Sequence, residues 1–159
     1  GELDVIASMQ GVHCTSDASW VPDRLGDQRS EDGAYVWRKL ADTGAVIVNG
    51  TDAPVEDVDP IASYYASVSR RLADGSIFYP DQRMERLEAL KTYTLNAAYG
   101  IFEDESRGSL AVGKLADIVV LSRNILEVPE EEILDAKVVY TVLGGEVVYE
   151  APLGETPRG

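Results

Sequence analysis

The alternation of apolar and polar positions divides the first hundred residues of the chain into short elements. Short apolar runs indicate buried strands, and apolar residues at helical spacing indicate amphipathic helices. Asp59 and Pro60 form a helix-start signal, and Gly75 is a stop signal for the same helix. The pattern predicts strands at 3–9 and 45–49 and helices at 34–43, 60–73 and 86–98. This order favours parallel βα units.

A polar stretch, residues 11–33, separates the first strand from the first helix. We expect it to be a long loop. Loops of this length inside a compact domain are usually functional or disordered. The stretch is therefore a place to look for functional side chains.

The character of the chain changes near residue 108, where turn residues and β-branched runs become more frequent. Two such runs flank Gly144-Gly145, which predicts a hairpin. We expect an α/β part over 1–107, a β-rich part over 108–150 and a disordered tail over 151–159. Within the β-rich part, the pattern predicts a strand at 118–121, a short helix at 129–134 and the hairpin at 138–149.

The net charge of the chain limits the classes of molecule that it can bind. The chain has 159 residues, is 45% hydrophobic and carries a formal net charge of −14. A globular chain of this charge is repelled by nucleic acids and anionic membranes, and its apolar runs are too short to span a bilayer. Acids dispersed along the chain with few lysines fit a halophilic protein of a high-salt cytoplasm or an ordinary acidic cytosolic protein. Both alternatives place the protein in the cytoplasm.

Asp52 is the first candidate for chemistry. It comes just after the apolar run 45–49 and before Pro54. An aspartate beyond the carboxyl end of a buried strand lies where α/β barrels keep their catalytic groups. There it can bind a divalent cation or accept a proton. The alternative is that its side chain caps a local turn.

His13 and Cys14 are the only histidine and the only cysteine of the chain. A loop histidine can bind a metal, contact substrate or shuttle a proton, although a lone one often does none of these. Catalytic zinc takes three protein ligands, and His13, Cys14 and Asp52 are the most that the chain offers. Adjacent residues rarely both reach one ion, so a metal site made by this chain alone is the least favoured alternative.

Several segments, in their order along the chain, resemble the C-terminal part of the amidohydrolase superfamily. The resemblance is to its family of large amidohydrolases, which includes formamide deformylase-like enzymes and members labelled as exoenzyme regulatory proteins. It extends over about residues 3–150. The segments that carry it are 8–17, 50–55, 59–60, 93–98, 108–121 and 144–149.

The resemblance implies a fold class and roles for two residues. The fold is α/β, with 3–9 and 45–49 as the last two strands of a (β/α)8 barrel and the segment from about 108 as strands of a small β-sandwich. Asp52 matches the aspartate that binds metal and relays a proton. His13 matches a histidine on the substrate side, outside the metal ligands. The strands that carry the remaining ligands would precede residue 1.

Two functions follow as expectations. The first is a metal-dependent hydrolase of amide or other non-peptide C–N bonds, with a small-molecule substrate and a divalent ion, zinc being the expected one. This chain alone would then be inactive and metal-free. Whether the protein forms a homo-oligomer is left open by the sequence. The alternative is a non-enzymatic regulatory or interaction protein on a decayed amidohydrolase fold. Histidine ligands upstream of residue 1 would favour the enzyme.

Overall fold

The computed structural model describes residues 2–152, and the chain divides into two compact units between Tyr93 and Thr94. The boundary expected near residue 108 stays a prediction. Most of the predicted tail, 153–159, lies outside the described residues. Each unit is described by itself.

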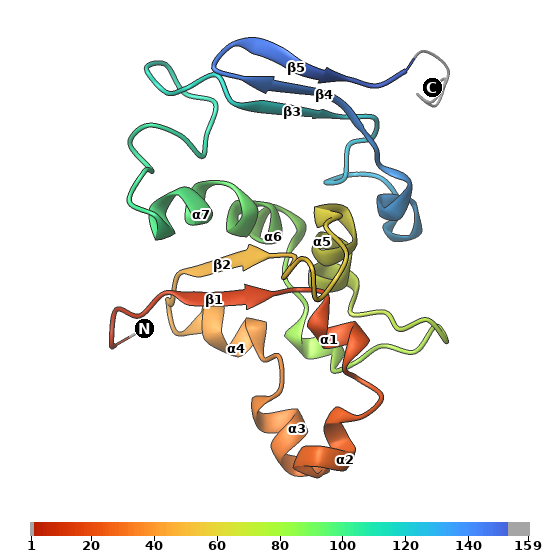
Figure 1. The fold of residues 1–159 in the computed structure, drawn as a ribbon. Helices are drawn as coiled ribbons and strands as arrows, with labels where there is room; N and C mark the ends of the chain where they lie inside the picture. Colours follow the sequence, from red (N-terminus) through yellow and green to blue (C-terminus); the bar gives the residue numbers. More distant parts are fainter. Residues whose placement is uncertain (1, 153–159) are drawn as a thin grey trace. The chain divides into compact units, whose positions relative to one another are not determined.

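The first unit contains a parallel pair of strands, β1 (Ala7–Gln10) and β2 (Ile47–Gly50) (Figure 1). Ala7 pairs with Ile47, and the register continues to Gln10 with Gly50. Both predicted strands form, and their parallel pairing is the one that βα units require. The first strand is shorter than predicted because Leu3 and Val5 are largely exposed and do not pack into the core.

The prediction of a loop over residues 11–33 was wrong. The segment forms three short helices, α1 (His13–Ser16), α2 (Val21–Leu25) and α3 (Asp27–Gly33). Pro22 occupies the first turn of α2, where its missing N–H costs nothing, and Gly26, with φ of 78°, separates α2 from α3. Helices this short do not show a full apolar period, which is why the pattern did not reveal them. The next helix, α4 (Trp37–Asp42), lies within the predicted range 34–43.

Helix α5 (Pro60–Ser69) begins as predicted, because the Asp59 carboxylate accepts a hydrogen bond of 2.9 Å from the Ile61 N–H. It ends before the predicted residue 73, at Arg70, which adopts a left-handed conformation with φ of 52°. The Arg70 side chain is fully buried. Its Nε donates to the Phe78 carbonyl at 2.5 Å and its Nη1 to the Tyr35 carbonyl at 2.9 Å. These bonds fix the course of the chain after α5.

The helix predicted over residues 86–98 is interrupted. The structure has α6 (Arg86–Tyr93) in the first unit and α7 (Leu95–Gly100) in the second. Thr94 lies between them with φ of −122° and ψ of −92°, outside the helical region. The break carries neither glycine nor proline, so the sequence gives no sign of it. A single turn, η1 (Pro80–Gln82), precedes α6.

The second unit contains an antiparallel sheet of β3 (Ile118–Leu121), β4 (Val138–Leu143) and β5 (Glu146–Glu150), in the order β3-β4-β5 (Figure 1). The predicted hairpin is confirmed, since Gly144 and Gly145 both have positive φ in its turn. The Asp117 carboxylate accepts from the Gly144 N–H at 2.9 Å and holds this turn. The short helix predicted at 129–134 is the 3-10 helix η2 (Glu130–Asp135).

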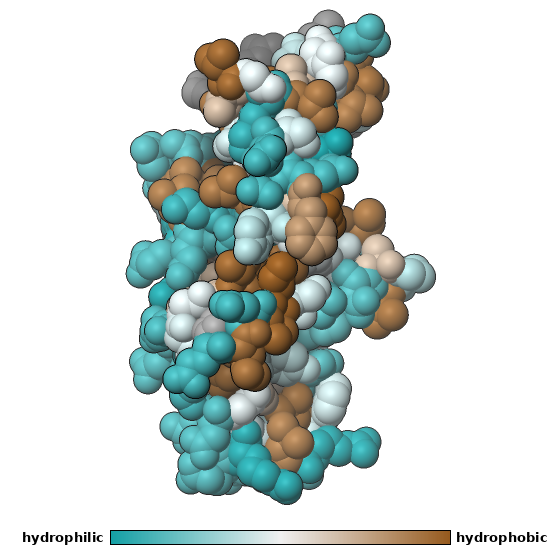
Figure 2. Space-filling view, turned by 90° about the vertical axis from the view of Figure 1, so that its left-hand side faces the viewer, coloured by the Kyte–Doolittle hydropathy of each residue, from teal (hydrophilic) through white to brown (hydrophobic). Residues whose placement is uncertain are grey.

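Apolar side chains are exposed on both units. In the second unit they include Leu143, Val147 and Val148 of the hairpin. Figure 2 shows hydrophobic residues, in brown, among hydrophilic ones on the face that it presents. Within residues 2–152, no helix has the length and apolarity needed to cross a membrane.

Gly11 fills a position with no room for a side chain. A Cβ placed there would lie 2.1 Å from the Ser67 Oγ and 2.5 Å from the Ser63 carbonyl oxygen. Both atoms belong to α5, so the chain leaving β1 can approach this helix only through a glycine.

We expect Gly11→Ala to lower the free energy of unfolding by about 1–3 kcal/mol, as overpacking does. The matched control is Gly33→Ala, because a Cβ at Gly33 meets nothing within 4 Å. The control should be neutral or slightly stabilising, since alanine favours helix over glycine. Urea unfolding followed by circular dichroism measures both changes, and equal stability of the two variants would contradict the close approach.

Candidate active site at the carboxyl ends of β1 and β2

The parallel pairing of β1 and β2 brings the segments after both strands to one edge of the sheet. His13 follows the end of β1 and begins α1, and Asp52 follows the end of β2. The carboxyl ends of parallel strands are the usual location of catalytic groups in α/β folds. The two residues singled out in the sequence therefore reach the same place.

The side chains of His13 and Asp52 face each other. The His13 Nε2 lies 3.4 Å from the Asp52 Oδ2 and 4.0 Å from the Glu56 Oε1. The side chains of His13, Asp52 and Glu56 are 22%, 40% and 24% exposed, so the group is partly exposed to solvent. An imidazole and carboxylates in this arrangement can exchange a proton or contact a polar substrate.

Sequence reasoning missed Glu56 and Ser16. The Ser16 Oγ donates a hydrogen bond of 2.7 Å to the Glu56 Oε1, which joins the end of α1 to the segment after β2. Ser16 lies one turn after His13, and Glu56 follows Asp52 closely in the same turn segment. This spacing is the one sequence signal that could have identified them.

The backbone of Asp52 is held in an uncommon conformation, with φ of 61°. Aspartate tolerates the left-handed region better than most residues. The Asp52 carbonyl accepts hydrogen bonds from the Val55 N–H at 2.8 Å and the Glu56 N–H at 3.3 Å. The backbone carbonyl of Asp52 thus closes the local turn. The alternative interpretation gave this role to the Asp52 side chain, but the carboxylate faces His13.

Cys14 does not belong to the site. Its side chain is fully buried, and its Sγ donates to the Ala66 carbonyl at 3.6 Å. Burial raises the pKa of the Cys14 thiol to about 11, and the charge of Arg70 offsets part of the rise. Among the residues that the structure describes, no group of three or more histidine, cysteine and acidic side chains is placed to hold a metal ion.

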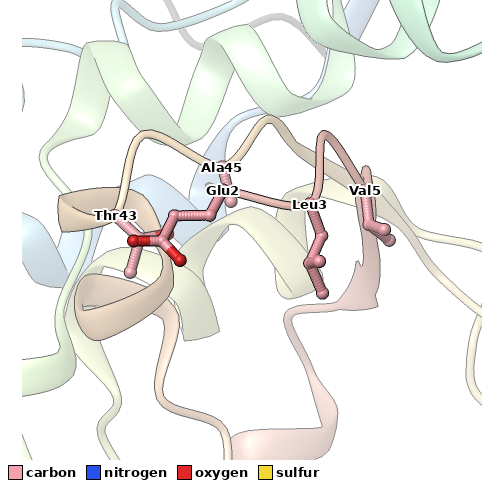
Figure 3. Close-up of a pocket in the computed structure, with 5 residues that line it drawn as sticks. All are labelled: Glu2, Leu3, Val5, Thr43 and Ala45. Carbon is pink, nitrogen blue, oxygen red and sulfur yellow. The ribbon is translucent and has the colours of Figure 1, made fainter.

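A pocket of about 490 Å³ lies elsewhere in the first unit, and Figure 3 shows the residues that line it. Glu2, Leu3 and Val5 precede β1, and Thr43 and Ala45 precede β2. The pocket is therefore at the amino ends of the two strands. In α/β barrels this side of the strands serves stability, whereas the carboxyl side serves chemistry. We assign it no role in the reaction.

The family is decided by a comparison with family models. The model of the amidohydrolase family matches residues 1–149, nearly the whole chain. The chain belongs to the amidohydrolase family. The resemblance noted in the sequence is thereby confirmed.

Three curated relatives are similar to the amidohydrolase chain over part of their own length. It is 34% identical to protein LONG AFTER FAR-RED 3 of Arabidopsis thaliana over 94% of its own length and 26% of that protein. It is 32% identical to the putative amidohydrolase YtcJ of Bacillus subtilis strain 168, over 93% of the chain and 28% of YtcJ. It is 28% identical to the N-substituted formamide deformylase of Arthrobacter pascens, over 71% of the chain and 21% of that enzyme. The chain spans about a quarter of the relatives that it matches.

A solved structure has a similar fold. An uncharacterized metal-dependent hydrolase from Pyrococcus furiosus superposes with a TM-score of 0.67 at 29% sequence identity, covering 79% of the chain and 25% of the hydrolase. The amidohydrolase chain thus resembles a part of a larger hydrolase.

The burial of Cys14 predicts a thiol that reacts slowly in the folded amidohydrolase chain. At pH 8 we expect native labelling by a thiol reagent to be roughly a hundredfold or more slower than labelling in urea, because the attacking thiolate is scarce at the raised pKa. Mass spectrometry of the single cysteine measures both rates. Equal rates would place Cys14 at the surface and reopen its role as a ligand.

Proposed function

We propose that this chain forms part of a metal-dependent hydrolase that cleaves amide or other non-peptide C–N bonds of small molecules. The observation that carries the proposal is the meeting of His13 and Asp52 at the carboxyl ends of β1 and β2, with 3.4 Å between the Nε2 and the Oδ2. The relatives named as an amidohydrolase and as an N-substituted formamide deformylase support the class of bond.

The fold of the whole protein is part of the same proposal. A pair of parallel strands cannot close a barrel, so we assign β1 and β2 to the last two strands of a (β/α)8 barrel. The antiparallel sheet β3-β4-β5 would belong to a small β-sandwich. The similarity to about a quarter of a metal-dependent hydrolase supports this division.

The residues of the chain fit a shared metal site and not a complete one. Asp52 offers a half-exposed carboxylate, a ligand that divalent cations accept. Catalytic zinc needs three protein ligands, and residues 2–152 hold no group of three. We therefore propose that Asp52 is the one ligand from this chain and that the others come from the rest of the protein. Zinc is the ion that we expect.

In the proposed mechanism, Asp52 handles the proton. A divalent ion, when bound with Asp52 as one of its ligands, would supply Lewis acidity and favour deprotonation of the attacking water. The Asp52 Oδ2 would accept a proton from the attacking water as the water oxygen bonds to the carbonyl carbon. Asp52 then returns the proton to the nitrogen as the C–N bond breaks, so that acid and amine leave as products. The partial exposure of the His13, Asp52 and Glu56 side chains would let a substrate reach them.

His13 acts on the substrate side. Its imidazole is close enough to orient Asp52 and, through its other edge, to meet a polar group of the substrate. It is not assigned as a metal ligand. The alternative of a regulator on a decayed fold has weaker support, because a carboxylate and an imidazole still meet at the reactive edge of the sheet.

The chain alone should show no hydrolase activity. We expect a full-length protein that contains this chain to hydrolyse members of a panel of N-substituted amides and formamides, with the activity lost on chelation and restored by zinc. The 159-residue chain should turn over none of them, because it lacks the remaining ligands. Chelator-sensitive turnover by the chain alone, or a zinc-loaded full-length protein that is inactive on the entire panel, would refute the proposal.

Substitutions in the full-length protein separate the two roles. Asp52→Asn keeps the shape and one ligand oxygen but removes the base, so kcat should fall by about 10²–10⁴ while metal content falls less. His13→Ala should raise KM with metal retained. The matched control is Asp74→Asn, since Asp74 lies in an exposed turn and bonds only locally, to Ser76.

Steady-state kinetics and metal analysis of the purified variants measure these effects. A normal kcat in Asp52→Asn would remove Asp52 from catalysis. Loss of metal in His13→Ala would make His13 a ligand.

A further inference from the structure

Asn49 joins the carboxyl ends of both strands to helix α5. Its Oδ1 accepts hydrogen bonds from the Gly11 N–H at 2.8 Å and the Gly50 N–H at 3.0 Å. Its Nδ2 donates to the Ser67 Oγ at 3.1 Å. One amide side chain therefore contacts the segment after β1, the end of β2 and the helix behind them.

Two serines of α5 complete the connection. The Ser63 Oγ donates to the Gly50 carbonyl at 3.1 Å and accepts from the Val12 N–H at 3.2 Å. The Ser67 Oγ donates to the Ser63 carbonyl at 3.0 Å and accepts from Asn49. Each hydroxyl uses its one proton once and accepts one bond, so donors and acceptors match along the chain of bonds. We call Asn49, Ser63 and Ser67 the α5 clamp.

The polarity of the clamp needs an explanation, because Ser63 and Ser67 are 1% and 0% exposed. Apolar residues would bury more favourably at these positions unless the hydroxyls serve backbone groups. Ser63 bonds an N–H and a C=O group at the ends of β1 and β2, where strand pairing stops, and Ser67 bonds the Asn49 amide and the Ser63 carbonyl. The serines are one turn apart on α5 and so lie on the same face of the helix.

The serines of the clamp are buried, whereas Asn49 is half-buried. Burial raises the pKa of the Tyr93 phenol to about 12, and the hydroxyls of Ser63 and Ser67 act in the opposite direction. Gly11 leaves no space between the backbone and these serines. Hydrogen bonds of buried groups are stronger than those in water.

We propose that the α5 clamp sets the separation of His13 and Asp52, and that Asn49, Ser63 and Ser67 are positioning residues of the site. His13 directly follows the clamped Val12, and Asp52 comes shortly after the clamped Gly50. A catalytic use of the separation between His13 and Asp52 rests on the proposed function. The effect of the α5 clamp on this separation does not.

Nuclear magnetic resonance of the 159-residue chain tests the clamp, because His13 gives the only imidazole signals. The wild-type chain should show an Overhauser contact between the His13 ring protons and the Asp52 methylene. Ser63→Ala should lose this contact. The matched control is Ser69→Ala, a serine of the same helix that is equally buried but bonds to the Arg71 N–H at 3.2 Å, outside the clamp. The control should keep the contact.

Variants at Asn49 give an independent check that includes a rescue. Asn49→Leu removes both functions of the amide and should lose the contact, whereas Asn49→Asp keeps an acceptor for both backbone N–H groups and should retain it. Unfolding midpoints of all variants separate a general loss of stability from a local change. A wild-type chain without the contact, or its retention in both Ser63→Ala and Asn49→Leu, would overturn the proposal.

The readout needs no metal, substrate or turnover. Failure of the hydrolase proposal would leave this result unchanged, and failure of the clamp would leave the hydrolase proposal standing.

Discussion

The parallel pairing of β1 with β2 is the constraint on which the site depends. In the register observed, Met9 pairs with Asn49 and Gln10 with Gly50. Because side chains alternate between the faces of a strand, a slip of one residue would turn Asn49 away from α5 and Ile47 out of the core. The burial of Met9 and Ile47 fixes the register, and the register in turn brings the segments with His13 and Asp52 to one edge. Packing in the core thus decides the geometry of polar groups at the surface.

Much of the fold could be predicted because several of its signals are local. Asp59 and Pro60 start α5, and Gly144-Gly145 closes the hairpin, through the chemistry of a few neighbouring residues. The short helices of residues 11–33 and the break at Thr94 could not be predicted in this way. They depend on packing against distant segments, as the contact of buried Cys14 with the Ala66 carbonyl illustrates. The end of α5 at Arg70 has the same origin, since the bonds to Tyr35 and Phe78 favour the left-handed turn there.

The candidate site was predictable only in its principal residues. Asp52 stands out because it follows an apolar run, and His13 because it is the only histidine. Glu56 and Ser16 are marked only by their spacing from these two residues, and the serines of α5 look like ordinary polar positions of an amphipathic helix. Their roles arise from hydrogen bonds between residues far apart in sequence, such as Val12 with Ser63. A single sequence holds no record of these pairs, and their geometry becomes visible only once the backbone is placed.

The buried Arg70 anchors a hairpin whose exposed tip can be lengthened. Its guanidinium holds the carbonyl of Phe78, and a bridge between Arg71 and Ile77 closes a small hairpin beyond it. The tip of this hairpin, Asp74-Gly75, is exposed and bonds only to residues of the hairpin itself, including the Arg71 side chain at its base. Lengthening an exposed tip whose base is anchored adds little loop-closure entropy. The protein therefore has a built-in attachment point, where a peptide epitope or a fluorophore could be inserted while β1, β2 and α5 keep their places.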